Sequence, residues 1–188
     1  MELFGNLETP SAFVIGCFHG DEPQGEFLIN KYLEKYKGTN VLFLPRLNSS
    51  STRVNKNGVD LNRNFPTKNW QLTEKNEFFG GLNPASENET KFLIETIQKY
   101  QPKIILTLHA PYKVVNYDGP AEEYAKKISD IIKYPVEASI GYPTPGSFGT
   151  WAGVERKIPI ITLELDEEVD VVELEQPVFK IFEMLEGV

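Results

Sequence analysis

The sequence has little of what disulfide-bonded, membrane-spanning or nucleic-acid-binding proteins need. It contains one cysteine, so neither an intrachain disulfide nor a cysteine-rich zinc site is possible. Its apolar runs are all far shorter than a membrane span. A net charge of −8 argues against nucleic acid as a partner, because phosphate-binding faces are basic. Residues 1–8 are acidic and lack the basic start and apolar run of a signal peptide, so we expect a cytoplasmic protein.

Apolar runs alternate with segments of helical spacing along the whole sequence. At 188 residues, a single domain covering residues 1–188 is expected. The alternation predicts an α/β sandwich whose sheet is mostly parallel. Strands are expected at residues 12–17, 40–45, 103–108 and 158–165, with a short edge strand at 112–117 and a short strand at 136–140. Helices are expected at 23–36, 87–100, 120–132 and 169–185.

Three of these helices carry local signals near their ends. Asp21 can cap the first helix, and Pro23 suits its first turn. Ser86 and Glu89 have the spacing of a capping box before the second helix. Pro177 predicts a kink or break in the C-terminal helix.

Residues 46–86 form a long polar stretch, rich in Asn, Ser, Gly and Pro, with no helical or strand period. A loop of that length in a compact domain is usually functional or disordered. The residues of this loop favour a functional role over disorder. An Arg-Asn pair at Asn62 and Arg63 can hold a carboxylate, and Asp60 can accept a hydrogen bond from the far nitrogen of a metal-ligating histidine. The alternative is a surface turn, since Asn and Gly are common turn residues.

The chain has only two histidines, and each follows an apolar strand. If the expected strands are parallel neighbours, then His19, Glu22, His109 and Glu164 meet at one edge of the sheet, where ligands bind in open α/β folds. Two imidazoles and one carboxylate form the ligand set of a catalytic zinc with an open position for water. The sequence therefore predicts a metal site at this edge of the sheet. The alternative for each histidine is an ordinary core or surface position.

Glu164 stands inside a strand that is otherwise apolar. Burial there raises the pKa of a carboxyl group, which suits a general base near neutral pH. The alternative is a carboxylate at the strand end with its head in solvent, which the acidic residues 166–168 favour. Cys17, two residues before His19, is either a fourth ligand or a small buried core residue, and the core position is the usual one for cysteine.

Together these motifs resemble the zinc carboxypeptidases of the carboxypeptidase A type. The motif His19-Gly20-Asp21-Glu22 is similar to that family's His-x-x-Glu ligand pair, and residues 59–65 are similar to its carboxylate-binding segment. His109 takes the place of the third ligand, and Glu164 that of the catalytic glutamate. The resemblance thus implies one Zn²⁺ per chain, held by His19, Glu22 and His109. The resemblance implies a three-layer sandwich, with a mixed, mainly parallel sheet between helices and one or more antiparallel strands.

Within that family the sequence most resembles the murein peptide amidases, through Pro66, residues 109–111 and the stretch 142–151. This resemblance implies a cytoplasmic enzyme of peptidoglycan recycling. Its partner would be a small peptide with a free carboxylate, cut at the amide between γ-D-Glu and meso-diaminopimelate.

The resemblance also implies roles for single residues. Glu164 activates the water, and Asn62 and Arg63 bind the substrate carboxylate. Tyr142 and Thr144 lie on the segment that would contact substrate. The family's carbonyl-polarising arginine aligns with a serine in the stretch 50–53, so this role passes to Arg53 or to Arg46.

Two other functions remain open from the sequence. One is an aspartoacylase-like deacylase of N-acyl amino acids, which uses similar zinc and arginine chemistry. The other is a non-catalytic domain that binds peptides, favoured by the displaced arginine and opposed by the retained Glu164. A scaffold role is a third reading, which the sequence neither supports nor excludes.

Overall fold

The computed structural model describes residues 1–36, 40–138 and 144–188. Its centre is a seven-stranded sheet with the order β1-β3-β2-β4-β7-β5-β6. The strands are β1 (Phe4–Gly5), β2 (Ala12–Ile15), β3 (Val41–Leu44), β4 (Ile104–His109), β5 (Tyr112–Asp118), β6 (Val136–Glu137) and β7 (Ile160–Asp166).

Strands β3, β2, β4 and β7 are parallel, whereas β1 and β5 run antiparallel to their neighbours β3 and β7. The short strand β6 is parallel to β5. The central strands are buried on both faces, which explains their unbroken apolar sequences. The expected mixed, mainly parallel sheet is confirmed.

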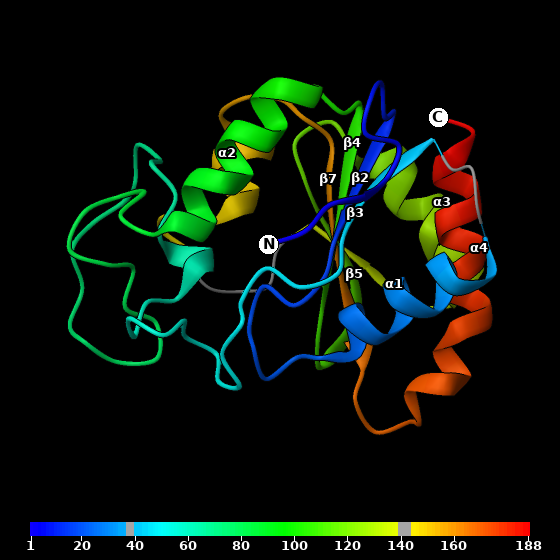
Figure 1. Cartoon of the computed structure of the whole chain (residues 1–188), viewed down its shortest axis with the longest axis horizontal. Coiled ribbons are helices and arrows are strands. Elements are labelled where there is room, and N and C mark those ends of the chain that lie inside the picture. Colours follow the sequence, from blue (N-terminus) through cyan, green and yellow to red (C-terminus); the bar gives the residue numbers. More distant parts are fainter. Residues whose placement is uncertain (37–39, 139–143) are drawn as a thin grey trace.

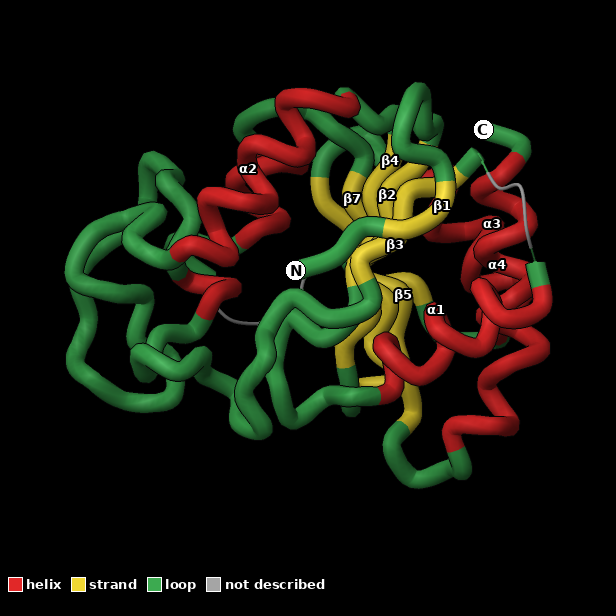
Figure 2. The backbone as a smooth tube through the Cα atoms, in the orientation of Figure 1, coloured by secondary structure: helices red, strands yellow, loops and turns green. Residues whose placement is uncertain are grey.

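Helices cover both faces of the sheet (Figure 1). One face packs against α1 (Gln24–Lys35), α3 (Glu122–Ile132) and α4 (Glu175–Glu186), which contribute buried apolar side chains to one core cluster. The other face packs against α2 (Asn88–Tyr100) and a π-helical turn, η2 (Gly149–Val154). The irregular stretch that follows β3 lies on this second side as well (Figure 2). Within the described residues, no helix combines the length and apolar character needed to cross a membrane.

Two of the expected helix caps are wrong. The first residue before α1 is Pro23, not Asp21, and no side chain caps this helix. At α2 the cap position is taken by Glu87, again without a side-chain cap bond. The Ser86 hydroxyl donates to the Glu87 carboxylate instead, so the capping box does not form.

The kink or break expected at Pro177 corresponds to a division of the C-terminal segment just before this residue. A short 3-10 turn, η3 (Val171–Leu174), precedes α4, so Pro177 falls within the first turn of that helix. A proline is tolerated there because its nitrogen needs no hydrogen-bond partner. The stretch 112–117 is not an edge strand, since β5 pairs with β7 on one side and β6 on the other. The expected end of the strand at Ile140 lies outside the described residues.

Candidate metal centre and substrate cavity

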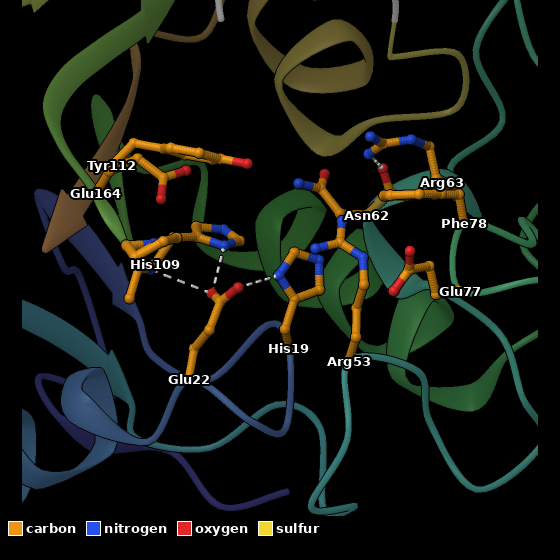
Figure 3. Close-up of a pocket in the computed structure, with 12 residues that line it drawn as sticks. His19, Glu22, Arg53, Asn62, Arg63, Glu77, Phe78, His109, Tyr112 and Glu164 are labelled. Atoms are coloured by element: carbon orange, nitrogen blue, oxygen red, sulfur yellow. Dashed lines mark hydrogen bonds and ion pairs between the residues drawn. The ribbon is translucent and has the colours of Figure 1, made fainter. Parts of the chain in front are cut away.

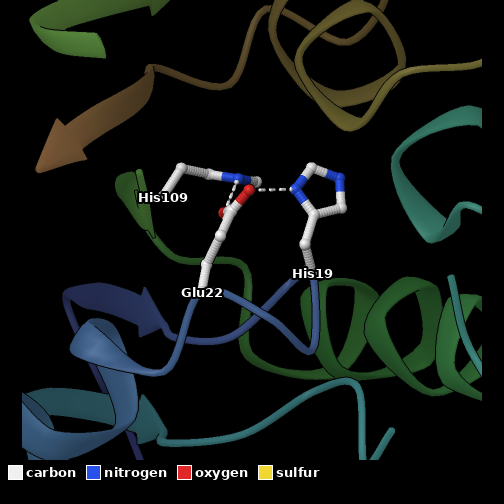
Figure 4. Close-up of side chains that lie close together, drawn as sticks. All are labelled: His19, Glu22 and His109. Atoms are coloured by element: carbon white, nitrogen blue, oxygen red, sulfur yellow. Dashed lines mark hydrogen bonds and ion pairs between the residues drawn. The ribbon is translucent and has the colours of Figure 1, made fainter. Parts of the chain in front are cut away.

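Three potential metal ligands meet beyond the ends of neighbouring strands. His19 and Glu22 lie on the turn between β2 and α1, and His109 is the last residue of β4. One ligand atom from each residue lies within 4.8 Å of the other two. The Glu22 carboxylate sits between the imidazoles, with Oε1 2.7 Å from His19 Nδ1 and Oε2 3.0 Å from His109 Nδ1 (Figure 4). The structure thus brings together the three residues that the sequence predicts.

The electrostatics of this group suit a cation. Burial alone would raise the pKa of Glu22, but contact with His109 and His19 outweighs it and holds that pKa well below its usual range. Burial alone would lower the pKa of His19, but hydrogen bonds with Asp60 and Glu22 raise it to about 9. In the metal-free chain Glu22 is therefore ionised at neutral pH and His19 carries a proton, and this proton takes the place of a metal's positive charge.

Asp60 connects this group to the long loop. Its Oδ1 lies 3.3 Å from His19 Nε2 and also accepts the backbone N–H of Asn62, which caps the short 3-10 turn η1 (Leu61–Arg63). Its Oδ2 accepts from both Nε and Nη2 of Arg53, at 3.1 and 2.9 Å. Burial would raise the pKa of Asp60, but its bond with His19 and the charges of His19 and Arg53 lower it to about 2. A fully buried carboxylate is thus kept ionised by its partners.

A cavity of about 460 Å³ opens over the metal group (Figure 3). Besides the three ligands, it is lined by residues from the long loop and from the start of β5. The complete lining is His19, Glu22, Arg53, Asn62, Arg63, Glu77, Phe78, His109, Ala110, Pro111, Tyr112 and Glu164.

Glu164 lies in β7 directly opposite His109 in β4. Its side chain is buried, and Oε2 has no hydrogen-bond partner among the described residues. Burial raises the pKa of Glu164, and the negative charge of Glu22 adds to this effect, while His109 and His19 oppose it. The solvated strand-end alternative is therefore wrong. The arrangement gives a proton acceptor beside the metal group.

Asn62 and Arg63 enter the cavity from η1. The Asn62 side-chain oxygen accepts from the backbone N–H of Phe148, so its amide nitrogen is turned toward the cavity (Figure 3). The Arg63 guanidinium donates to the backbone oxygen of Asn62 at 2.8 Å. The Phe78 ring lies against both arginines, 4.9 Å from Arg53 Cζ and 5.9 Å from Arg63 Cζ. These contacts order two cations on one wall of the cavity.

Of the two arginines left open by the sequence, only Arg53 lines the cavity. Arg46 bonds to the Glu26 carboxylate, with Nε 2.7 Å from Oε2, and to backbone oxygens of Asn48 and Ser50. The Cys17 thiol donates to the backbone oxygen of His19 and is not part of the ligand group. Burial raises the pKa of Cys17 to about 12, which suits the core position and not a metal ligand.

Of the two residues that resemblance places near the substrate, the structure describes only Thr144. Tyr142 falls outside the described residues. Thr144 lines a smaller cavity beside the main one, where its hydroxyl is 3.3 Å from Ser147 Oγ.

Three residues that line the main cavity, Tyr112, Glu77 and Phe78, were not predicted from the sequence. Tyr112 follows the ligand His109 by three residues, and that proximity was an available signal. Glu77 and Phe78 belong to the irregular loop, where no periodic pattern marks which side chains turn inward.

Comparisons with known proteins identify the family of this chain and several of its relatives. The profile of the zinc carboxypeptidase family matches residues 38–176. Murein peptide amidase A of Vibrio campbellii is 38% identical over 136 residues, which are 64% of this chain and 53% of the relative. The enzyme of the same name from Escherichia coli K12 is 36% identical over 124 residues, 60% of this chain and 50% of the relative. The chain thus spans about half the length of the curated relatives it matches.

Solved structures show the same fold. The crystal structure of murein-tripeptide amidase MpaA from Escherichia coli O157 superposes with a TM-score of 0.87 at 26% identity, covering 98% of this chain and 85% of that one. Carboxypeptidase A from Helicoverpa armigera superposes with a TM-score of 0.73 at 16% identity, covering 95% of this chain and 61% of that one.

Proposed function

The chain belongs to the zinc carboxypeptidase family, and from this we propose that it is a zinc-dependent amidase of murein peptides, cutting the amide between γ-D-Glu and meso-diaminopimelate. The observation that carries the proposal is one cavity that holds a His-Glu-His group, a buried carboxylate without a partner among the described residues, and two arginines. The amidases to which the chain is similar support the choice of substrate.

The donor set fits zinc. His19 and His109 offer ring nitrogens and Glu22 an oxygen, all within 4.8 Å of one another, and Asp60 orients the far nitrogen of His19. We assign one Zn²⁺ per chain to these three ligands. When bound, zinc acts as a Lewis acid that lowers the pKa of water and polarises a carbonyl group.

Glu164 acts as the general base and then as the general acid. Its carboxylate takes a proton from the attacking water and passes it to the nitrogen of the departing amine, so the carboxylate is regenerated in each turnover. The buried position supports this role, because it raises the pKa toward the pH at which a base and an acid are both effective.

Arg53 and Arg63 have different roles. The Arg53 guanidinium stabilises the negative charge that develops on the carbonyl oxygen, and Asp60 holds it in place. Arg63 and Asn62 bind the free carboxylate of the substrate, which selects peptides with that group next to the bond that is cut. Thr144 and Tyr142 contact the substrate beyond this carboxylate, a role proposed from their place in the sequence.

We place the enzyme in peptidoglycan recycling in the cytoplasm, with residues 1–188 as one catalytic domain. The support for the role is the resemblance to murein peptide amidases, and the support for one domain is the single seven-stranded sheet.

The test combines metal analysis with a product assay. Purified, zinc-loaded protein is incubated with L-Ala-γ-D-Glu-meso-diaminopimelate and, separately, with N-acetyl-aspartate. We expect one zinc per chain and release of free diaminopimelate. Zinc-loaded protein that leaves the tripeptide intact would overturn the proposal, and faster hydrolysis of N-acetyl-aspartate would favour the deacylase.

A further inference from the structure

A second, smaller cavity of about 50 Å³ adjoins the metal centre. It shares Asn62 and His109 with the main cavity, so a ligand held by Asn62 lies at its entrance. Most of its lining residues are polar, and the one carboxylate among them is Asp118, at the end of β5.

The register of the sheet shows how far Asp118 lies from the metal centre. His109 and Glu164 lie opposite each other, Thr107, Thr162 and Asn116 form the next row on the same face, and Asp118 lies in the row of Ile160. At about 3.3 Å per residue, the row of Asp118 is roughly 13 Å from the row of Glu164. A group that reaches Asp118 from the metal centre must therefore be the end of a long side chain.

Asp118 has no hydrogen bond or ion pair with any described residue. Desolvation by burial raises the pKa of its carboxyl group. The neighbouring Asn116 uses its amide nitrogen on the backbone oxygen of Glu137, which leaves its own oxygen as a second acceptor. An ionised carboxylate in such a place is costly unless a cation accompanies it.

The fold makes room for this carboxylate. Gly149 and Gly153 of η2 both lie against Asp118, and a Cβ atom at either position would collide with its side chain. Two glycines on one short helical turn thus allow close approach to Asp118.

We propose that Asp118 is a specificity residue that binds a primary ammonium group at the far end of the substrate's leaving amino acid. The inference rests on the proposed function for the placement of that amino acid, whose carboxylate Asn62 and Arg63 hold at the cavity entrance. Its side chain then passes the row of Thr107 and Thr162 and ends between Asp118 and Asn116. An amino acid with a distal amine, such as diaminopimelate, meets this requirement, whereas one with an apolar end leaves the carboxylate unpaired.

The test uses two tripeptides that differ only in the distal amine. One ends in diaminopimelate and the other in 2-aminopimelate, which has the same carbon chain and distal carboxylate. We expect kcat/KM of the wild type to favour the first by roughly 10–100-fold, because the analogue leaves a buried polar group unpaired. Asp118→Asn should remove most of this preference by raising KM for the first peptide, with zinc content unchanged.

Matched controls keep the inference separate from folding and from the proposed function. Asp130→Asn, on the exposed side of α3, should keep the full preference. Asp118→Ser serves as a second variant, and melting temperature shows whether each variant is folded. Calorimetry with free diaminopimelate and free 2-aminopimelate measures the same preference without turnover.

The outcomes separate clearly. A folded Asp118→Asn protein that keeps the preference in both assays would overturn the role of Asp118 and leave the amidase function intact. Protein that binds diaminopimelate through Asp118 but cuts neither peptide would overturn the proposed function and support the ammonium site.

Discussion

His109 and Glu164 lie directly opposite each other on the neighbouring parallel strands β4 and β7. The pairing places a proposed metal ligand and a buried carboxylate side by side on one face of the sheet, at its carboxyl edge. Backbone hydrogen bonds of the sheet, and not a flexible loop, therefore set their separation. Residues held on rigid strands can keep the geometry that proton transfer requires.

Replacing Glu164 with glutamine should abolish turnover without releasing the metal. The amide has nearly the same shape but cannot accept the proton from water, so we expect kcat to fall by roughly 10²–10⁴-fold. Zinc content, measured by atomic emission on the same sample, should stay at the wild-type level because Glu164 is not among the three ligands. Near-normal turnover would remove Glu164 from the mechanism.

Zinc binding should release a proton at neutral pH. The pKa of His19 in the metal-free chain is raised to about 9, so below that pH zinc must displace the proton that His19 carries. Affinity should therefore rise with pH by up to about tenfold per unit until pH 9 and then level off. Calorimetry in buffers of different ionisation enthalpy measures the released proton directly.

The control for this pH dependence is Asp60→Asn. It removes the carboxylate whose hydrogen bond raises the pKa of His19, so the plateau in zinc affinity should begin at lower pH. An unchanged profile in this variant would show that Asp60 does not set the protonation of His19.

The two arginines left open by the sequence should behave differently. Arg53→Ala should lower kcat by about 10²–10³-fold, the size of effect expected when a donor to a developing oxyanion is lost. Arg46→Ala should leave kcat within about threefold and lower stability by no more than about 1 kcal/mol, since its ion pair with Glu26 is partly exposed. Steady-state kinetics on both variants decides between them, and the reverse pattern would assign the role to Arg46.

Arg63→Gln should weaken substrate binding more than it slows the chemical step. Loss of a charged hydrogen bond to the substrate carboxylate is expected to raise KM by roughly 10–150-fold. A peptide amide that lacks the free carboxylate provides the control, because it should be an equally poor substrate for wild type and variant. Equal KM values for the free acid in both proteins would contradict the assignment.

Asn64 should be a stability hot spot of the long loop. Its amide nitrogen donates to the backbone oxygen of Gly80 and to Ser86 Oγ, and its oxygen accepts the backbone N–H of Glu87. Asn64→Ala leaves these buried groups without partners, so we expect a loss of about 2–4 kcal/mol and a drop in melting temperature of roughly 5–15 °C. The exposed Gln71→Ala on the same loop should change stability by less than about 0.5 kcal/mol.

The group of His19, Glu22 and His109 could be predicted because each histidine lies beside a recognisable apolar run in the sequence. A histidine shortly after an apolar run, as at His19, or at its end, as at His109, indicates a candidate ligand near the end of a buried strand. Parallel strands bring such ends together. Glu164 was less certain from the sequence, because the acidic residues after it also fit a solvated strand end. The structure shows that this carboxylate is buried, and that β5 extends the sheet beyond β7.

The local sequence pattern could not predict the direction of β5 or the path of the long loop. The period of two in β5 is the same for a parallel and an antiparallel strand, so its reversal and its place inside the sheet came only from resemblance or from the structure. Arg46 and Arg53 have similar sequence surroundings, and the hydrogen bonds of Asp60 and Glu26 decide which one enters the cavity. Tertiary contacts of this kind leave no periodic signal in a loop.

The strand order has a consequence for how a nascent chain assembles. Strand β5 reaches β4 only through β7, which is made some forty residues later and inserts between them. Until β7 has left the ribosome, β4 presents an open edge and β5 has no place in the growing sheet. The three proposed metal ligands all lie within the first 109 residues, whereas Glu164, the proposed proton acceptor, is made together with β7. On the proposed function, the site is therefore complete only after β7 has taken its place between β4 and β5.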